Sequence, residues 1–144
     1  MFTQAQIKKY FDKAKEVSKL SDFPKTKLGC VIVYKGIVIG VGFNSNKTSP
    51  MQKKYSKPIY DRDGFIETKH AFSMHAEIAC LNSVKYIEGI DWGKCAMFIY
   101  REHKSKHVPL LAKPCEACMS AILEKGIKEV YYTTDEIPYK KLEL

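Results

Sequence analysis

Two short stretches, SMHAEI at residues 73–78 and KPCEAC at residues 113–118, decide how this chain is organised. Each has the character of the first turn of a helix. Cys115 and Cys118 are three residues apart, so on a helix both sulfurs lie on one face and can reach one metal ion. His75 can supply a third ligand, which leaves a fourth position open, as in a catalytic zinc site rather than a closed structural one. The two stretches therefore predict one Zn²⁺ site built from two helix starts.

The neighbours of these ligands fit the same site. Pro114 suits the first position of a helix because it has no N–H to lose, and the positive end of a helix favours thiolate over thiol. Two thiolates balance the charge of Zn²⁺, so Glu77 remains as the local anion that can take a proton from a water and pass it on. The Ala76 N–H, at a helix start, can bind a carbonyl oxygen of a ligand.

Length and composition predict a single domain over residues 1–144. A chain of 144 residues with 45% apolar residues can form one core. No apolar run approaches the roughly 18 residues of a membrane span, and the first residues, MFTQ, lack the layout of a signal peptide. Five cysteines, an odd number of which two suit a metal, indicate a reducing compartment. We therefore expect a cytoplasmic protein without a membrane partner.

The chain is basic, with a formal net charge of +8. Residues 45–72 and residues 101–113 each carry three more basic than acidic residues, so together they hold six of the eight net charges. A basic balance favours an anionic partner such as a nucleotide, a phosphate or a nucleic acid. A lysine-rich proteome with well-solvated surfaces explains the same composition, and both readings stay open.

Hydrophobic periodicity predicts alternating helices and strands. Helices are expected over residues 3–20, with Thr3 and Gln6 as a capping box, over 74–86 with Ser73 as N-cap, and over 114–125. Strands are expected over residues 28–34, 37–43, 95–100 and 127–133, with a last short one at most within 139–144. Residues 45–72 and 101–113 are expected to be loops. The order predicts an α/β fold, a three-layer α-β-α sandwich around a mixed four- or five-stranded sheet.

The motif H-A-E at residues 75–77, followed by P-C-E-A-C at 114–118, resembles the signature of the zinc-dependent cytidine and deoxycytidylate deaminase superfamily, which also contains the tRNA adenosine deaminases. The resemblance implies a cytidine-deaminase-like fold, Zn²⁺ on His75, Cys115 and Cys118, and Glu77 as the catalytic acid and base. It also implies that Asn44, in a Gly-aromatic-Asn motif, contacts the ribose of a substrate. The alternative for Asn44 is an Asx-type turn.

Within the superfamily, residues 44–52 look most like phage-borne proteins of the deoxycytidylate group. Ala79 departs from that group, whose members often carry Asn at this place. The sequence therefore leaves the base, the sugar and the phosphate count open.

These residues are compatible with two enzymatic functions. The first is hydrolytic deamination of a free cytosine nucleotide or nucleoside. The second is deamination of cytosine or adenine in single-stranded DNA or RNA or in tRNA, because basic loops with interleaved aromatic residues also suit nucleic acid. The short C-terminal part argues against the second, since nucleic-acid enzymes of the superfamily rely on that region.

Two alternative interpretations of the cysteines and their neighbours account for fewer of these residues. A structural zinc module is opposed by the open coordination position and by Glu77, and a redox role for the two cysteines would leave His75 unexplained. A second metal at His103 and His107 is conceivable, but histidines in a lysine-rich loop are more often solvated. Relatives commonly assemble, so a homo-oligomer is one option.

Overall fold

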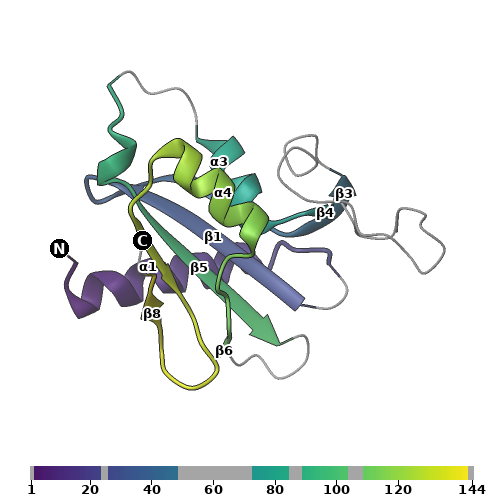
Figure 1. The fold of residues 1–144 in the computed structure, drawn as a ribbon. Helices are drawn as coiled ribbons and strands as arrows, with labels where there is room; N and C mark the ends of the chain where they lie inside the picture. Colours follow the sequence, from purple (N-terminus) through teal and green to yellow (C-terminus); the bar gives the residue numbers. More distant parts are fainter. Residues whose placement is uncertain (1, 24–25, 49–72, 85–88, 104–108, 143–144) are drawn as a thin grey trace.

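The computed structural model of the chain describes residues 2–23, 26–48, 73–84, 89–103 and 109–142 (Figure 1). Its centre is a mixed sheet in the order β2-β1-β5-β7-β8, in which β6 also pairs with β5. Strands β5 and β7 run parallel, and the other neighbours are antiparallel. The strands are β1 (Thr26–Tyr34), β2 (Ile37–Phe43), β5 (Ala96–His103), β6 (Pro109–Leu110), β7 (Glu129–Tyr132) and β8 (Lys140–Lys141).

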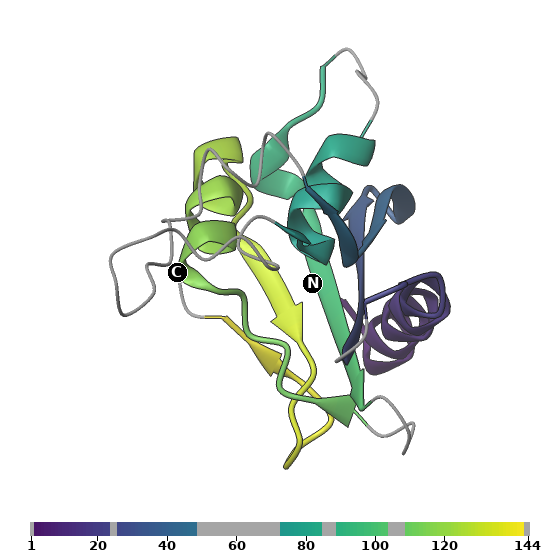
Figure 2. The ribbon, with the colours of Figure 1, turned by 90° about the vertical axis from the view of Figure 1, so that its right-hand side faces the viewer.

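Helices cover both faces of this sheet. Helix α1 (Gln4–Ser18) lies on one face, and α3 (Ala76–Ser83) and α4 (Glu116–Lys125) lie side by side on the other (Figures 1 and 2). A separate two-stranded sheet pairs β3 (Ser45–Thr48) with β4 (Ser73–Met74), just before α3. A short 3-10 helix (Trp92–Lys94) precedes β5. The predicted three-layer α/β sandwich is confirmed, but the described part of the sheet has six strands rather than four or five, because β6 also pairs with β5.

The two faces of the sheet divide the core into two clusters. Val31 and Phe98 point towards α1, whereas Ile32 and Ile99 point towards α3 and α4. This alternation is the period of two that a strand imposes on its side chains. Strand β2 is an edge strand, and Ile37 at its start is 64% exposed.

Two glycines allow helices to pack directly on the strands, as their positions in the apolar runs indicate. A Cβ added at Gly29 would lie 2.0 Å from the backbone oxygen of Ala14 in α1. A Cβ at Gly42 would lie 2.3 Å from the backbone nitrogen of Cys80 in α3. Any side chain at Gly42 would therefore push α3 away from the sheet, and α3 is the helix that follows His75.

Several predicted boundaries are corrected by the structure. Helix α3 begins at Ala76, with His75 rather than Ser73 as N-cap, and it ends at Ser83 instead of reaching residue 86. Helix α4 begins at Glu116 with Cys115 as N-cap, so Pro114 lies before the helix and not at its first position. In both cases a predicted metal ligand itself takes the capping position.

The predicted loops also contain strands. Strand β5 continues to residue 103, because its residues 101 and 102 pair with β6 as well as with β1. Residues 45–48 form β3 instead of irregular chain, whereas most of the predicted long loop, residues 49–72, lies outside the described residues. The capping box of Thr3 and Gln6 is confirmed, with reciprocal hydrogen bonds of 2.8 and 3.1 Å.

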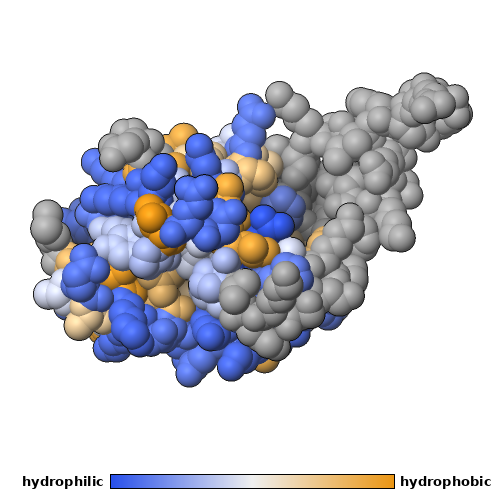
Figure 3. Space-filling model, turned by 90° about the horizontal axis from the view of Figure 1, so that it is seen from below, coloured by the Kyte–Doolittle hydropathy of each residue, from blue (hydrophilic) through white to orange (hydrophobic). Residues whose placement is uncertain are grey.

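One face of the described surface is mainly hydrophilic (Figure 3). In the face shown in Figure 3, hydrophilic residues surround separate apolar patches. Within the described part of the chain, no helix combines the length and apolar character that crossing a membrane requires.

Candidate metal centre and active site

The two predicted ligand stretches meet where α3 and α4 begin. His75 and Cys115 are the N-cap residues of these helices, and both have extended backbone dihedrals. Their carbonyl oxygens accept the first helical hydrogen bonds, from Ala79 at 3.0 Å and from Met119 at 2.9 Å. The backbones of His75 and Cys115 are thereby fixed at adjacent helix starts on the same face of the sheet.

Three ligand atoms converge at this point. The His75 Nδ1 lies 3.3 Å from the Cys118 Sγ and 3.5 Å from the Cys115 Sγ. All three atoms are within 4.8 Å of one another, and they form the one group of this kind among the described residues. One imidazole nitrogen with two sulfurs suits zinc, and three protein donors leave a fourth position for a water or a substrate. His107, the other half of the conceivable second site, lies outside the described residues.

The protonation of the two cysteines differs. The Cys118 thiol donates to Cys115, and the Cys118 backbone N–H also points at the Cys115 Sγ, at 3.5 Å. These hydrogen bonds, together with His75, lower the pKa of Cys115 to about 4, whereas the same pairing and burial raise the pKa of Cys118. The hydrogen bond between His75 and Cys115 raises the pKa of the His75 imidazole. One ligand of the triad is thus already a thiolate, as a cation site requires.

Glu77 lies on the first turn of α3, beside the triad. It is only 3% exposed, and its Oε1 atom has no hydrogen-bond partner in the structure. Burial raises the pKa of its carboxyl, and the nearby His75 opposes that change. A buried carboxylate oxygen without a partner is costly, so its presence indicates a group that acts on a ligand. This orphaned oxygen and the anionic Cys115 both fit a bound Zn²⁺ with a water.

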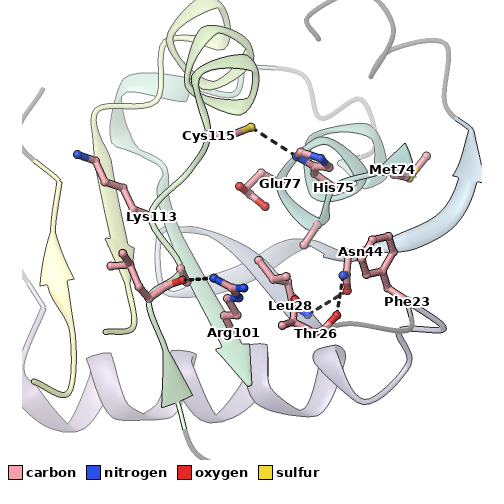
Figure 4. Close-up of a pocket in the computed structure, with 13 residues that line it drawn as sticks. Phe23, Thr26, Leu28, Asn44, Met74, His75, Glu77, Arg101, Lys113 and Cys115 are labelled. Carbon is pink, nitrogen blue, oxygen red and sulfur yellow. Dashed lines mark hydrogen bonds between the residues drawn. The ribbon is translucent and has the colours of Figure 1, made fainter. Parts of the chain in front are cut away.

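A pocket of about 240 Å³ opens in front of these residues (Figure 4). His75, Ala76, Glu77 and Cys115 line it at the helix starts, and Asn44 lines it on the β1 side. Cys118 lies behind them, fully buried. The structure therefore brings all six predicted site residues together.

Asn44 also has a structural role that the sequence did not reveal. It is 6% exposed. Its Oδ1 accepts hydrogen bonds from the Leu28 N–H, at 2.9 Å, and from the Ser21 hydroxyl, while its Nδ2 donates to the Thr26 carbonyl at 2.9 Å. Asn44 thus joins the end of β2 to the start of β1. Its contact with a substrate stays a prediction.

The pocket has further lining residues that sequence reasoning missed. They are Phe23, Thr26, Leu28, Met74, Arg101, Leu111, Ala112 and Lys113. Arg101 could have been found, because it is a charged residue directly after the buried apolar run of β5. The others lie in short connections or at strand ends, where nothing in the pattern marks them.

Comparison with known proteins agrees with this geometry. Residues 4–134 match the family described as the cytidine and deoxycytidylate deaminase zinc-binding region. A deoxycytidylate deaminase of Pongo abelii is 25% identical over 116 residues, which cover 78% of this chain and 56% of that protein. A probable deoxycytidylate deaminase of Caenorhabditis elegans is 25% identical over 130 residues, 88% of this chain and 57% of its own length. The chain thus spans little more than half the length of these curated relatives.

Solved structures share the fold. The dCMP deaminase of cyanophage S-TIM5 in apo form superposes with a TM-score of 0.59 and 24% identity, covering 92% of this chain and 86% of that one. The cytidine deaminase of Burkholderia pseudomallei gives a TM-score of 0.63 with 18% identity, covering 99% and 93%. Together with the match over residues 4–134, these findings identify the chain as a member of the cytidine and deoxycytidylate deaminase zinc-binding family.

Proposed function

We propose that this protein is a zinc-dependent hydrolytic deaminase that converts the C4 amine of a cytosine nucleotide or nucleoside into a carbonyl and releases ammonia. One observation carries the proposal. The His75 nitrogen and two cysteine sulfurs converge at one end of a pocket, next to the buried, unpartnered Oε1 of Glu77. This arrangement joins a metal site that has an open position to a carboxylate with no structural partner for that oxygen.

His75, Cys115 and Cys118 would hold the metal. Zinc in such a site supplies Lewis acidity that brings the pKa of a water towards 7. The proposed role of the protein is to hold the site fixed: Cys118 is fully buried, and Cys115 and His75 are held at helix starts. A fixed environment of low dielectric strengthens the electrostatic interactions that favour the reaction.

Glu77 is the proposed proton carrier. The reaction consumes one water, whose oxygen becomes the C4 carbonyl oxygen while the C4–N bond breaks and ammonia leaves. In the proposed sequence, Glu77 takes a first proton from the water and gives it to the N3 ring nitrogen. It then moves the second proton of that water, from the oxygen now bonded to C4, to the departing amine. The raised pKa of Glu77, caused by its burial, makes its carboxylate a better proton acceptor.

Two further groups are proposed to orient the base and the sugar. The Ala76 N–H, at the first position of α3, is proposed to bind the base carbonyl. The Asn44 amide, after its bonds to β1, retains one N–H that can donate to a ribose hydroxyl. The S-TIM5 dCMP deaminase in complex with dCMP and dUMP is similar to this chain, with a TM-score of 0.58, which supports a cytosine nucleotide as the substrate to test first.

The test is an ammonia-release assay on the zinc-loaded protein. The substrates are cytidine, deoxycytidine, CMP, dCMP, adenosine and a short single-stranded oligonucleotide, and the control protein is Glu77→Gln. We expect turnover of a free cytosine nucleotide or nucleoside and none with the control. Turnover of the oligonucleotide or of adenosine alone would refute the substrate, and no turnover of any substrate would refute the proposed activity.

A further inference from the structure

Arg101 extends the site towards β6. It follows the buried run of β5 and pairs with Leu28 in β1 and with Leu110 in β6. Its place in the alternation puts it on the same sheet face as Met97 and Ile99, the face that α3 and α4 cover. The apolar face of β5 therefore ends in a guanidinium at the pocket (Figure 4).

The hydrogen-bonding capacity of Arg101 is only partly used. Its Nη1 donates to the Leu111 carbonyl at 3.1 Å, while its buried Nε has no partner in the part of the chain that the structure describes. Among the residues that the structure describes, no carboxylate forms an ion pair with Arg101. A guanidinium has five N–H donors in a fixed fork, and a buried donor without an acceptor is costly. The geometry therefore leaves donors at the pocket for an anionic ligand.

The neighbouring residues hold this fork in place. The Arg101 backbone N–H donates to the Thr133 Oγ1 at 3.2 Å, and that hydroxyl donates to the Leu110 carbonyl at 2.8 Å. Thr133 thus ties β5 to β6, and the Nη1 bond ties the guanidinium to the segment that follows. Because the side chain is already fixed, little conformational entropy is lost when a ligand binds.

The charges lining the pocket favour an anion. Lys113 is a second cation on the β6 side, and Glu77 is the one carboxylate among the described lining residues. In Figure 4, Arg101 and Lys113 lie apart from His75 and Cys115, with Glu77 between them and His75. A ligand whose base reaches the triad would extend its other end towards these cations.

We propose that Arg101, assisted by Lys113, binds the 5′-phosphate of a cytosine nucleoside monophosphate and so makes the site select nucleotides over nucleosides. The inference rests on the proposed function and specifies its substrate. Arginine suits this task because its fork matches two phosphate oxygens, whereas lysine acts as a point charge. A hydroxyl in place of the phosphate would leave the Arg101 donors unpaired, and such a loss discriminates strongly.

The test compares kcat/KM for dCMP and for deoxycytidine in Arg101→Gln, Arg101→Lys and Lys113→Gln. The matched control is Lys94→Gln, which removes one positive charge from an exposed position outside the pocket. We expect the dCMP-to-deoxycytidine ratio to fall about 10- to 100-fold in Arg101→Gln, mainly through KM. Arg101→Lys should recover part of the ratio, Lys113→Gln should lower it less, and Lys94→Gln should not change it.

Binding measurements separate this inference from the proposed function. If no substrate is turned over, calorimetric titration with dCMP, deoxycytidine and inorganic phosphate still decides it. Tighter binding of dCMP than of deoxycytidine, weakened in a folded, zinc-loaded Arg101 variant, would support the inference. An unchanged ratio or unchanged dCMP affinity in that variant, or wild-type preference for the nucleoside, would overturn it. A preference for an oligonucleotide over dCMP would also overturn it.

Discussion

Replacing Glu77 with glutamine should separate activity from stability. The Glu77 carboxyl is 3% exposed and its Oε1 has no partner, so the folded protein carries a costly buried group. Glutamine has nearly the same shape but cannot carry a proton. We expect kcat to fall by about 10²- to 10⁴-fold, the usual contribution of a positioned acid and base.

The same change should stabilise the metal-free protein. An unpaired buried polar group costs roughly 1–3 kcal/mol, and the cost is higher when the group is charged. Glutamine keeps a polar atom there but removes the charge, so we expect a gain of about 1–2 kcal/mol. For a chain of this size each kcal/mol corresponds to about 2–4 °C in Tm.

The pH dependence gives the sign of this effect. Burial raises the pKa of the Glu77 carboxyl in the folded state. A raised carboxyl pKa contributes stability that is fully present below the unfolded pKa of about 4.3 and is lost as pH rises through the folded value. The stability advantage of Glu77→Gln should therefore be larger at pH 7.5 than at pH 4.5.

The assay is thermal unfolding of metal-free protein at the two pH values, with kcat measured on zinc-loaded protein. Metal content measured in parallel should show that the variant still binds zinc. A glutamine variant that keeps wild-type kcat would refute the proton-carrier role. A variant that is less stable than the wild type at pH 7.5 would refute the view that the buried carboxyl is kept for function.

Four further changes test the site and its support. Cys118→Ser should reduce zinc from one per chain to near zero, whereas Cys95→Ser, at a buried thiol outside the triad, should retain it. Zinc binding at pH 7 should release at least one proton, because Cys115 is already ionised while the raised pKa of Cys118 keeps its thiol protonated. The raised pKa of His75 favours an imidazolium that must also lose its proton, so affinity should rise with pH. Gly42→Ala should destabilise the protein by about 1–3 kcal/mol and weaken zinc binding, because its Cβ would meet the α3 backbone. Asn44→Ala should cost about 2–4 kcal/mol of stability as well as substrate affinity, because three hydrogen bonds to β1 and Ser21 are lost.

Each of these four predictions has a result that would contradict it. Full zinc content in Cys118→Ser, or zinc loss in Cys95→Ser, would contradict the ligand assignment. Proton release is measured by calorimetry in buffers of different ionisation enthalpy, and no release would contradict the unequal protonation of the cysteines. Unchanged Tm in Gly42→Ala or Asn44→Ala, measured by thermal unfolding, would contradict the packing of α3 or the strand-tying role of Asn44.

The metal triad was predictable because its chemistry is local. Cys115 and Cys118 are one helical turn apart, and the H-A-E motif fixes His75 and Glu77 relative to one another. Because each stretch begins a helix on the same side of the sheet, the topology brings them together. Apolar periodicity also gave the layers, since a strand alternates and a helix repeats every three to four residues.

The rest depends on contacts between distant residues. The sequence predicts that Arg101 begins a basic loop. In the structure its pairing with Leu110 extends β5, and Arg101 lines the pocket. The sequence predicts either a turn or a ligand contact for Asn44. Its hydrogen bonds to Thr26 and Leu28 follow only from the register of the neighbouring strands. The predicted helix starts were wrong. Ser73 has a stronger preference for the N-cap position than His75, and Pro114 has a strong preference for the first helical position.

X-ray absorption at the zinc edge tests the central claim most directly, because it counts the ligands of the metal. For the zinc-loaded protein we predict two sulfur ligands at about 2.3 Å and two nitrogen or oxygen ligands at about 2.0–2.1 Å, one of them the His75 imidazole. The sulfur count should fall in Cys118→Ser. A shell of three or four sulfurs, or a spectrum that Cys118→Ser leaves unchanged, would contradict a site with an open position for chemistry.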